Sequence, residues 1–325
     1  MIAQDPVIAV SGLYKRFNLE AGFFARLGRY VHAVNGVSFN IRKNETYGLV
    51  GESGCGKTTT ARLLVRMYEA DEGEILFQGQ EIRKFRGRDF KRYREKVKYV
   101  FQDPARSLNP RMTVFEVLTS GAKWASEKRI SGALREEAAA MLEEAGLSAA
   151  DLDRRPAEFS GGQRQRISIA RGLMMKPSLL ICDEVVSALD VSIQGQILNL
   201  LLDLRERRLS AGEEISFLFI AHDLKVASYF CDRIGVMYMG EIMEEAPAAD
   251  LWKGCLHPYT ELLFSSAGSA AESRLPGTPA APAQSPRYAQ GCAFAARCPY
   301  AEERCFKEKP VEREAGKEHF YRCWR

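Results

Sequence analysis

Short apolar runs and longer helical patterns alternate along this chain. Runs rich in β-branched and aromatic residues, broken by Gly and Asn, predict strands. They fall at residues 7–10, 36–41, 46–50, 74–77, 98–101, 178–182 and 215–220. Helices are expected at about 58–67 and 193–207, and residues 18–30 are expected to form an inserted loop. Strands that alternate with helices favour an α/β fold.

A helical segment interrupts the strands between about residues 103 and 176. Within it, apolar residues recur at the spacing of one helix face, namely Leu134, Ala138, Met141, Leu142 and Ala145. Residues 265–291 are rich in Ser, Ala, Gly and Pro, which is typical of a linker. We therefore predict a large domain at 1–264 with a helical subdomain at about 103–176, a linker at 265–291 and a cysteine-rich region at 292–325.

Composition and charge limit the class of protein to which the chain can belong. The chain has 325 residues, of which 46% are hydrophobic and 27% are charged, as in ordinary globular proteins. Its net charge of +4 is too small to indicate nucleic-acid binding. No apolar stretch approaches the roughly 20 residues of a membrane-spanning helix, and the first residues do not resemble a secretion signal. We expect a cytoplasmic location.

Residues 51–58 match the pattern G-x-x-x-x-G-K-[ST]. The pattern follows a predicted strand and precedes a predicted helix, which is the arrangement that binds a phosphate chain. Its glycines let backbone N–H groups surround phosphate, Lys57 reaches the terminal phosphates and the Thr58 hydroxyl ligates Mg²⁺. The alternative is a glycine-rich turn that arose by chance.

Asp183 and Glu184 follow an apolar strand, and ligands bind at strand ends in α/β sheets. Asp183 is expected to hold Mg²⁺, and Glu184 to polarise the water that attacks the γ-phosphate. Gln102 and His222 also follow predicted strands; Gln102 is a candidate to ligate Mg²⁺ or orient water, and His222 to contact the γ-phosphate. For Asp183 and Glu184 the alternative is a solvated acidic turn. For Gln102 and His222 it is an ordinary structural role.

Residues 160–163, Ser-Gly-Gly-Gln, begin a strongly helical stretch that extends to about Met174. A hydroxyl and free N–H groups at a helix N-terminus form an anion site. The alternative is an ordinary N-cap serine followed by two flexible glycines.

Taken together, residues 51–58, 102, 160–163, 183–184, 187–190 and 222 resemble, in order, the Walker A, Q-loop, signature, Walker B, D-loop and H-loop motifs of ABC-type ATPases. The resemblance covers residues 7 to about 245. It implies a P-loop NTPase core with an antiparallel β subdomain and a helical subdomain. It also implies a head-to-tail dimer, identical or not, in which two ATP molecules lie at the interface. Val185 stands where many relatives carry Pro, and we expect little effect.

The resemblance assigns roles to individual residues. Glu184, His222 and Gln102 are the expected catalytic residues. Phe17 is the expected adenine contact, with Tyr14 as the alternative. The other expected contacts to ATP and Mg²⁺ are Gly51, Ser53, Gly54, Cys55, Gly56, Lys57, Thr58, Thr59, Gln102, Asp183, Ser160, Gly161, Gly162, Gln163 and Asp190, with Thr58, Gln102 and Asp183 on Mg²⁺.

Finer features resemble the ATPases of oligopeptide, dipeptide and nickel uptake systems. They are the segments at 101–112, 190–194 and 257–260, with Gly291, Cys292 and residues 297–299 in the tail. This resemblance implies two membrane permease subunits, a substrate-binding protein outside the membrane, often a second ATPase subunit, and a peripheral place on the cytoplasmic face of the inner membrane. The alternatives are a soluble ABC ATPase that acts on ribosomes or DNA and a small P-loop kinase.

The tail cysteines, Cys292, Cys298, Cys305 and Cys323, lack the paired C-x₂-C spacing of common zinc ribbons. Four thiolates can still hold a tetrahedral metal or an iron–sulfur cluster, whereas disulfides are disfavoured in a reducing cytoplasm. The family resemblance implies a [4Fe–4S] cluster on these four residues. Zinc, for which His319 is a nearby additional ligand, and unligated thiols remain alternatives.

Overall fold

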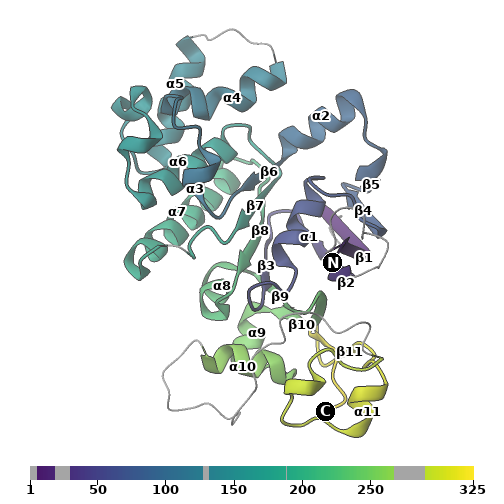
Figure 1. The fold of residues 1–325 in the computed structure, drawn as a ribbon. Helices are drawn as coiled ribbons and strands as arrows, with labels where there is room; N and C mark the ends of the chain where they lie inside the picture. Colours follow the sequence, from purple (N-terminus) through teal and green to yellow (C-terminus); the bar gives the residue numbers. More distant parts are fainter. Residues whose placement is uncertain (1–5, 19–29, 127–131, 188, 267–289) are drawn as a thin grey trace. The chain divides into compact units, whose positions relative to one another are not determined.

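The strand and helix patterns fold into two units (Figure 1). The computed structural model describes residues 6–18, 30–126, 132–187, 189–266 and 290–325. What we call the helical unit comprises Met1–Val7, Arg42–Glu45 and Glu81–Phe219, and the β-rich unit comprises Ile8–Ile41, Thr46–Gln80 and Ile220–Arg325. Each unit is described by itself below.

The β-rich unit contains two sheets. The first has the strand order β2-β1-β4-β5, and β1 pairs antiparallel with both of its neighbours. In the second, the order β11-β12-β10-β9-β3 places β3 parallel to β9, while β10 pairs antiparallel with β9 and β12. All five residues of β3 are buried, as expected for a strand covered on both faces. The strands are β1 (Ile8–Asn18), β2 (Tyr30–Ile41), β3 (Thr46–Val50), β4 (Glu72–Phe77), β9 (Arg233–Tyr238), β10 (Glu241–Pro247), β11 (Arg313–Glu314) and β12 (Phe320–Tyr321).

The helices of the β-rich unit are mostly short. They are α1 (Lys57–Leu64), α8 (Leu224–Phe230), α9 (Ala248–Lys253), α10 (Pro258–Ser266), the 3₁₀ helix η5 (Ala295–Arg297) and α11 (Glu303–Lys307). Strands β5 (Gln80–Glu81) and β8 (Ser216–Ala221) cross the division between the units.

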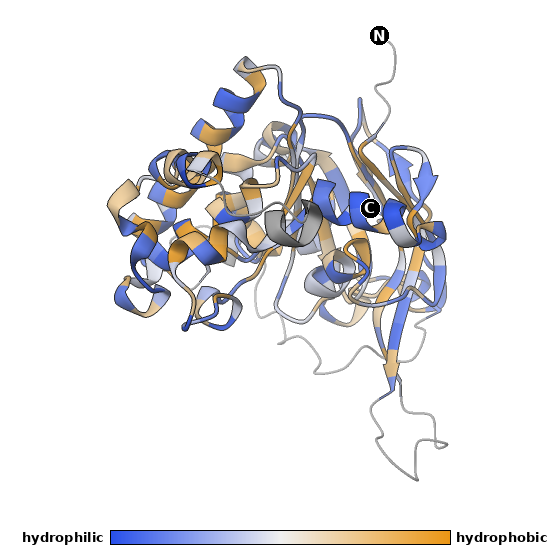
Figure 2. Cartoon of the chain, turned by 90° about the horizontal axis from the view of Figure 1, so that it is seen from above, coloured by the Kyte–Doolittle hydropathy of each residue, from blue (hydrophilic) through white to orange (hydrophobic). Residues whose placement is uncertain are grey.

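The helical unit is built around a parallel strand pair and a group of contacting helices, α4, α5 and α6 (Figure 1). Of the predicted apolar face, Ala138, Met141, Leu142 and Ala145 are buried and Leu134 is half-buried. Figure 2 shows hydrophobic and hydrophilic residues interspersed along the helices, as expected for helices with one buried side. The elements are η2 (Ile82–Lys84), α2 (Gly87–Lys96), β6 (Val97–Val100), α3 (Pro104–Ser107), α4 (Val114–Ser126), α5 (Gly132–Glu144), η3 (Ala149–Asp153), η4 (Pro156–Glu158), α6 (Gly161–Leu173), β7 (Leu179–Asp183) and α7 (Val191–Ser210).

The structure confirms the predicted strands and helices, with shifted ends. Strand β1 continues to Asn18 and β2 begins at Tyr30, so both ends of the expected insertion belong to strands. Residues 19–29 of that insertion, and residues 267–289 of the expected linker, lie outside the described residues.

Candidate functional site

The phosphate loop lies between β3 and α1 in the β-rich unit, as the sequence predicts. Gly56 is the N-cap of α1 and has φ of +113°, a conformation that other residues rarely adopt. A Cβ atom added to Gly56 would lie 2.1 Å from the carbonyl oxygen of Ala33. Glycine is therefore required here for both backbone conformation and space. Ser53 and Gly54 are exposed, so the outer side of the loop is open to a ligand.

Lys57 holds the loop together from inside. Its ammonium group donates hydrogen bonds to the carbonyl oxygens of Gly51 at 2.7 Å and Glu52 at 2.9 Å, and the residue is only 3% exposed. Burial raises the pKa of the neighbouring Cys55 thiol despite the opposing influence of Lys57. Cys55 therefore stays protonated and inert at neutral pH. Thr58 and Thr59 follow in the first turn of α1 and are half-buried.

Two more predicted site residues lie in the β-rich unit. His222 is exposed and follows the last residue of β8. Its position is fixed because Asp223 caps α8 by accepting hydrogen bonds from the N–H groups of Lys225 at 2.7 Å and Val226 at 3.3 Å. Phe17 is half-buried and contacts Tyr68 edge to face, with 5.2 Å between ring centroids. Its contact with adenine, and the alternative contact of Tyr14, remain predictions.

In the helical unit, strand register brings Gln102 to Glu184. Strands β6 and β7 run parallel with Val100 opposite Cys182, so the residues two positions beyond them leave the sheet side by side. The Gln102 amide nitrogen donates a hydrogen bond to Glu184 Oε2 at 2.7 Å. It also lies 3.4 Å from Ser187 Oγ. Among the described residues, no group donates to the other Glu184 carboxylate oxygen, Oε1.

The backbone at Glu184 is strained. Its φ is +48°, in the left-handed region, which costs a residue with a side chain about 1–3 kcal/mol. The turn that follows is closed by a hydrogen bond from the N–H of Ser187 to the Glu184 carbonyl at 3.1 Å. Such strain is common where a side chain must be directed out of a strand end for function.

Asp183 is 2% exposed and accepts a hydrogen bond from the Tyr99 hydroxyl at 2.5 Å. Tyr99 lies on β6, three residues before Gln102, and sequence analysis did not identify it as a site residue. The signal was available, because a tyrosine near the end of a buried strand needs a polar partner for its hydroxyl. Tyr99 fixes the orientation of the carboxylate that is expected to meet Mg²⁺.

The segment 160–163 begins α6, and the structure confirms the N-cap interpretation while the anion site remains a prediction. Ser160 is the N-cap: its hydroxyl accepts from the Gln163 N–H at 3.3 Å, and the Gln163 side chain accepts from the Ser160 N–H at 3.0 Å. This reciprocal arrangement is a capping box. Ser160, Gly161 and Gln163 are all exposed, so the helix N-terminus remains accessible to an anion. Asp190 is exposed and is the N-cap residue of α7, and Ala188, two positions earlier in the sequence, is outside the described residues.

The four tail cysteines line one cavity of about 330 Å³ in the β-rich unit. The β12 strand delivers Cys323 to it by pairing with β10, and Cys292 is held by a hydrogen bond from its N–H to the Cys305 carbonyl at 2.7 Å. Burial raises the pKa of Cys292 to about 12, and burial also raises the pKa of Cys298 and Cys323. His257, Phe294 and Trp324 complete much of the apolar wall.

His319 is not a wall residue of this cavity. Its ring lies 2.7 Å from Glu244 Oε1, a side chain that also accepts hydrogen bonds from the N–H groups of Leu256 and His257. The structure therefore does not place His319 with the four cysteines, and its Nε2 atom is paired with Glu244. Within the residues that the structure describes, no group of three or more His, Cys, Asp or Glu side chains has the geometry of a metal-ion site.

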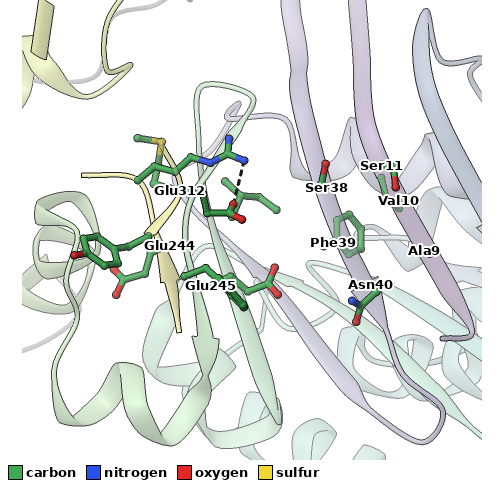
Figure 3. A pocket seen from close by; sticks show the side chains of 14 residues that line it. Ala9, Val10, Ser11, Ser38, Phe39, Asn40, Glu244, Glu245 and Glu312 are labelled. Atoms are coloured by element: carbon green, nitrogen blue, oxygen red, sulfur yellow. Dashed lines mark hydrogen bonds and ion pairs between the residues drawn. The ribbon is translucent and has the colours of Figure 1, made fainter. Parts of the chain in front are cut away.

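A second cavity, of about 270 Å³, is rich in carboxylates (Figure 3). Glu244, Glu245 and Glu312 line it, but each is paired: Glu244 with His319, Glu245 with the Tyr47 hydroxyl at 2.6 Å, and Glu312 with Arg322 at 3.2 Å. The carboxylates are thus accounted for by contacts that stabilise the fold. This cavity contains none of the predicted ATP contacts.

Comparisons with known proteins agree with this geometry. A family model described as "ABC transporter" matches residues 34–187. Among solved structures, cbiO1 from Clostridium perfringens, part of the ABC transporter complex cbiONQ, has a TM-score of 0.65 and 25% identity over 77% of this chain and 92% of its own. The dimeric ATP-binding cassette MJ0796, solved with ADP and Pi, has a TM-score of 0.63 and 27% identity over 74% of this chain and 98% of its own. Fold and site together define an ATPase of the ATP-binding cassette class.

Other comparisons narrow the class. A model described as "Oligopeptide/dipeptide transporter, C-terminal region" matches residues 243–305. The oligopeptide transport ATP-binding protein AppF of Bacillus subtilis is 41% identical over 98% of this chain and 97% of its own length. The oligopeptide transport ATP-binding protein OppF of Haemophilus influenzae is 40% identical over 95% of this chain and 93% of its own length. The chain belongs to the family of ATP-binding proteins of oligopeptide and dipeptide ABC transporters. None of its described helices has the length and apolar character needed to cross a bilayer.

Proposed function

We propose that this chain is the ATP-hydrolysing motor of a peptide importer and works as one of two ATPase subunits beneath two membrane permeases. In this proposal it binds peripherally at the cytoplasmic face of the inner membrane, and a substrate-binding protein outside the membrane selects the peptide. The peptide-transport names of relatives that match almost the whole chain support it. The ribosome or DNA alternative has no such support, and the small P-loop kinase does not explain the segment 160–163.

The assignment of ATP hydrolysis rests on one observation, the hydrogen bond between Gln102 and Glu184, which directly follows Asp183 in the sequence. The loop N–H groups and Lys57 bind the β- and γ-phosphates of ATP, and Phe17 or Tyr14 contacts the adenine. Glu184 accepts a proton from the attacking water as its oxygen bonds to the γ-phosphorus and the bond to the β–γ bridging oxygen breaks. Gln102 orients the water and His222 contacts the γ-phosphate.

Other residues serve the metal and the partner subunit. Thr58, Gln102 and Asp183 would hold Mg²⁺ through oxygen ligands of the kind it prefers, and the bound ion would neutralise charge that develops on the phosphates. Residues 160–163 and Asp190 bind the nucleotide held by the second subunit. Their exposure supports this role, as does the anion-binding character of the helix N-terminus at residues 160–163.

Co-purification tests the transport assignment. Affinity-tagged full-length chain, isolated from detergent-solubilised membranes of cells that also make the neighbouring gene products, should bring down two permease subunits. Labelled peptide should accumulate in these cells and not in cells producing the Glu184→Gln variant, which should still co-purify with the permeases. Recovery of the chain with ribosomes or DNA and without permeases would contradict the proposal.

We also propose that Cys292, Cys298, Cys305 and Cys323 bind a [4Fe–4S] cluster with a structural or regulatory role. All four thiols line one cavity, and this enclosure fits a shared group. Trp324 also lines the cavity, and its buried indole N–H has no acceptor among the described residues, so a group bound there could accept from it. Zinc would need four sulfurs about 2.3 Å from one ion, and the described thiols do not form such a site. A cluster is larger and suits a cavity of this volume.

Anaerobic purification of the full-length chain tests the cluster. We expect about four iron and four acid-labile sulfide per chain, with broad visible absorption. The Cys298→Ser variant should lose most of the iron, because serine is a poor cluster ligand. The matched control is Cys255→Ser, since Cys255 does not line the cavity. Stoichiometric zinc without iron, or equal iron in Cys298→Ser and wild type, would contradict the cluster.

A further inference from the structure

Two residues of the C-terminal region hold one residue of the phosphate loop. The Glu52 N–H donates a hydrogen bond to the Tyr259 hydroxyl at 2.9 Å. The Glu52 carboxylate accepts two hydrogen bonds from Arg297, both at 2.9 Å, one on each oxygen. Arg297 lies 245 positions further along the sequence and directly precedes Cys298. The cysteine-rich region therefore contacts the ATP-binding loop, and both belong to the β-rich unit.

Arg297 is rigidly placed. Its side chain is 8% exposed, and its guanidinium group lies 5.6 Å from the ring centroids of both Tyr238 and Phe294. These two rings pack edge to face at 5.3 Å, and the Tyr259 ring lies 4.6 Å from that of Tyr238. A two-point arginine–carboxylate pair against aromatic rings has little freedom to move. The pair is thus a fixed feature of the loop.

The charge of this pair matters for ATP. Glu52 carries its carboxylate on the loop that must accept a triphosphate, and like charges repel more strongly where water is partly excluded. The Glu52 side chain is 29% exposed, so solvent screens it only in part. Arg297 cancels its charge and holds both carboxylate oxygens. The backbone carbonyl of the same residue remains available to Lys57.

We propose that Arg297 is a positioning residue of the ATP site, which neutralises Glu52 and holds it so that the loop can accept the triphosphate. The role assigned is to ATP binding and not to the chemical step. It rests on the ATP binding of the family and is independent of the iron–sulfur cluster, so either proposal can fail alone.

Equilibrium binding of ATP to the full-length chain tests this role through Arg297→Gln, Glu52→Gln and the double variant. Arg297→Gln leaves a carboxylate without its partner, and we expect the Kd for ATP to rise about tenfold or more. Glu52→Gln removes the carboxylate itself, so its Kd for ATP should rise much less than that of Arg297→Gln. The double variant should return to within about threefold, because no uncompensated charge remains. In the assembled transporter, KM for ATP should follow Kd while kcat changes little.

Arg304→Ala is the matched control. Arg304 also directly precedes a tail cysteine, Cys305, but it pairs with Glu302. It should leave ATP affinity unchanged, and thermal unfolding without nucleotide and iron content should be measured for every variant. An Arg297→Gln variant that binds ATP like wild type overturns the proposal, as does a double variant that binds as weakly as Arg297→Gln or does not fold. If Arg297→Gln alone does not fold, near-wild-type binding by the double variant supports the proposal.

Discussion

Replacing Glu184 by Gln is expected to lower kcat for ATP hydrolysis by about 100- to 10,000-fold, the usual contribution of a general base. The Kd for ATP should stay within about threefold of wild type, since the substitution removes an interaction needed only in the transition state. Single-turnover hydrolysis and equilibrium nucleotide binding by the full-length chain measure the two quantities separately. The expected result is a protein that binds ATP and does not turn it over.

The structure explains why this variant separates binding from chemistry. A glutamine at this position keeps an oxygen that can accept the 2.7 Å hydrogen bond from Gln102, and it has almost the same volume as glutamate. The strained φ of +48° is equally unfavourable for both residues, so the backbone has no reason to relax. What is lost is the carboxylate charge and its ability to accept a proton.

Glu214→Gln is the control for this experiment. Glu214 belongs to the same unit and pairs at the surface with Lys43 at 3.0 Å. Removing its charge should leave kcat unchanged, because exposed ion pairs contribute little. Steady-state hydrolysis by the Glu184→Gln variant at the wild-type rate would show that Glu184 is not the base.

Much of the fold and several site contacts follow from the sequence because strand ends are easy to recognise. The apolar runs before Gln102 and Asp183 predict two strands, and parallel pairing of those strands places the side chains together. Glycines and lysine in a fixed spacing after a buried strand likewise predict the phosphate loop. In each case the chemistry depends on residues close to an element that local pattern can identify.

Other features depend on contacts between distant segments and could not be predicted. Strand β10 carries three glutamates, which disfavour a buried strand, and it forms because Glu244 pairs with His319 while Glu241 accepts from Asn35 and Lys309. The Arg297–Glu52 pair joins residues 245 positions apart, and no local pattern indicates it. Burial of charge becomes acceptable only after tertiary structure supplies the partner.

Lys57 is placed so that one group serves two states of the loop. Its ammonium group bridges the Gly51 and Glu52 carbonyls in a position that is 97% shielded from solvent, given its exposure of 3%. Charge-assisted hydrogen bonds of this kind each contribute about 1.5–3 kcal/mol. A triphosphate that enters the loop offers the same ammonium group stronger, fully charged acceptors. Binding therefore exchanges internal partners for phosphate oxygens and leaves no buried charge unpaired.

Lys57→Ala is accordingly expected to raise the Kd for ATP by about 100-fold or more, because two or more charge-assisted bonds are lost at once. Without nucleotide the variant should lose about 3–6 kcal/mol of stability, since two hydrogen bonds of about 1.5–3 kcal/mol each are removed. Thermal unfolding with and without saturating ATP measures both the loss of stability and the loss of ATP binding. Wild type at 100 times its Kd gains about 2.7 kcal/mol, and the variant at the same ATP concentration should gain less than about 0.5 kcal/mol. The control Lys253→Ala, which removes an exposed lysine paired with Asp250, should show the same stabilisation by ATP as wild type. If ATP stabilised Lys57→Ala as much as wild type, the phosphates would not bind at Lys57.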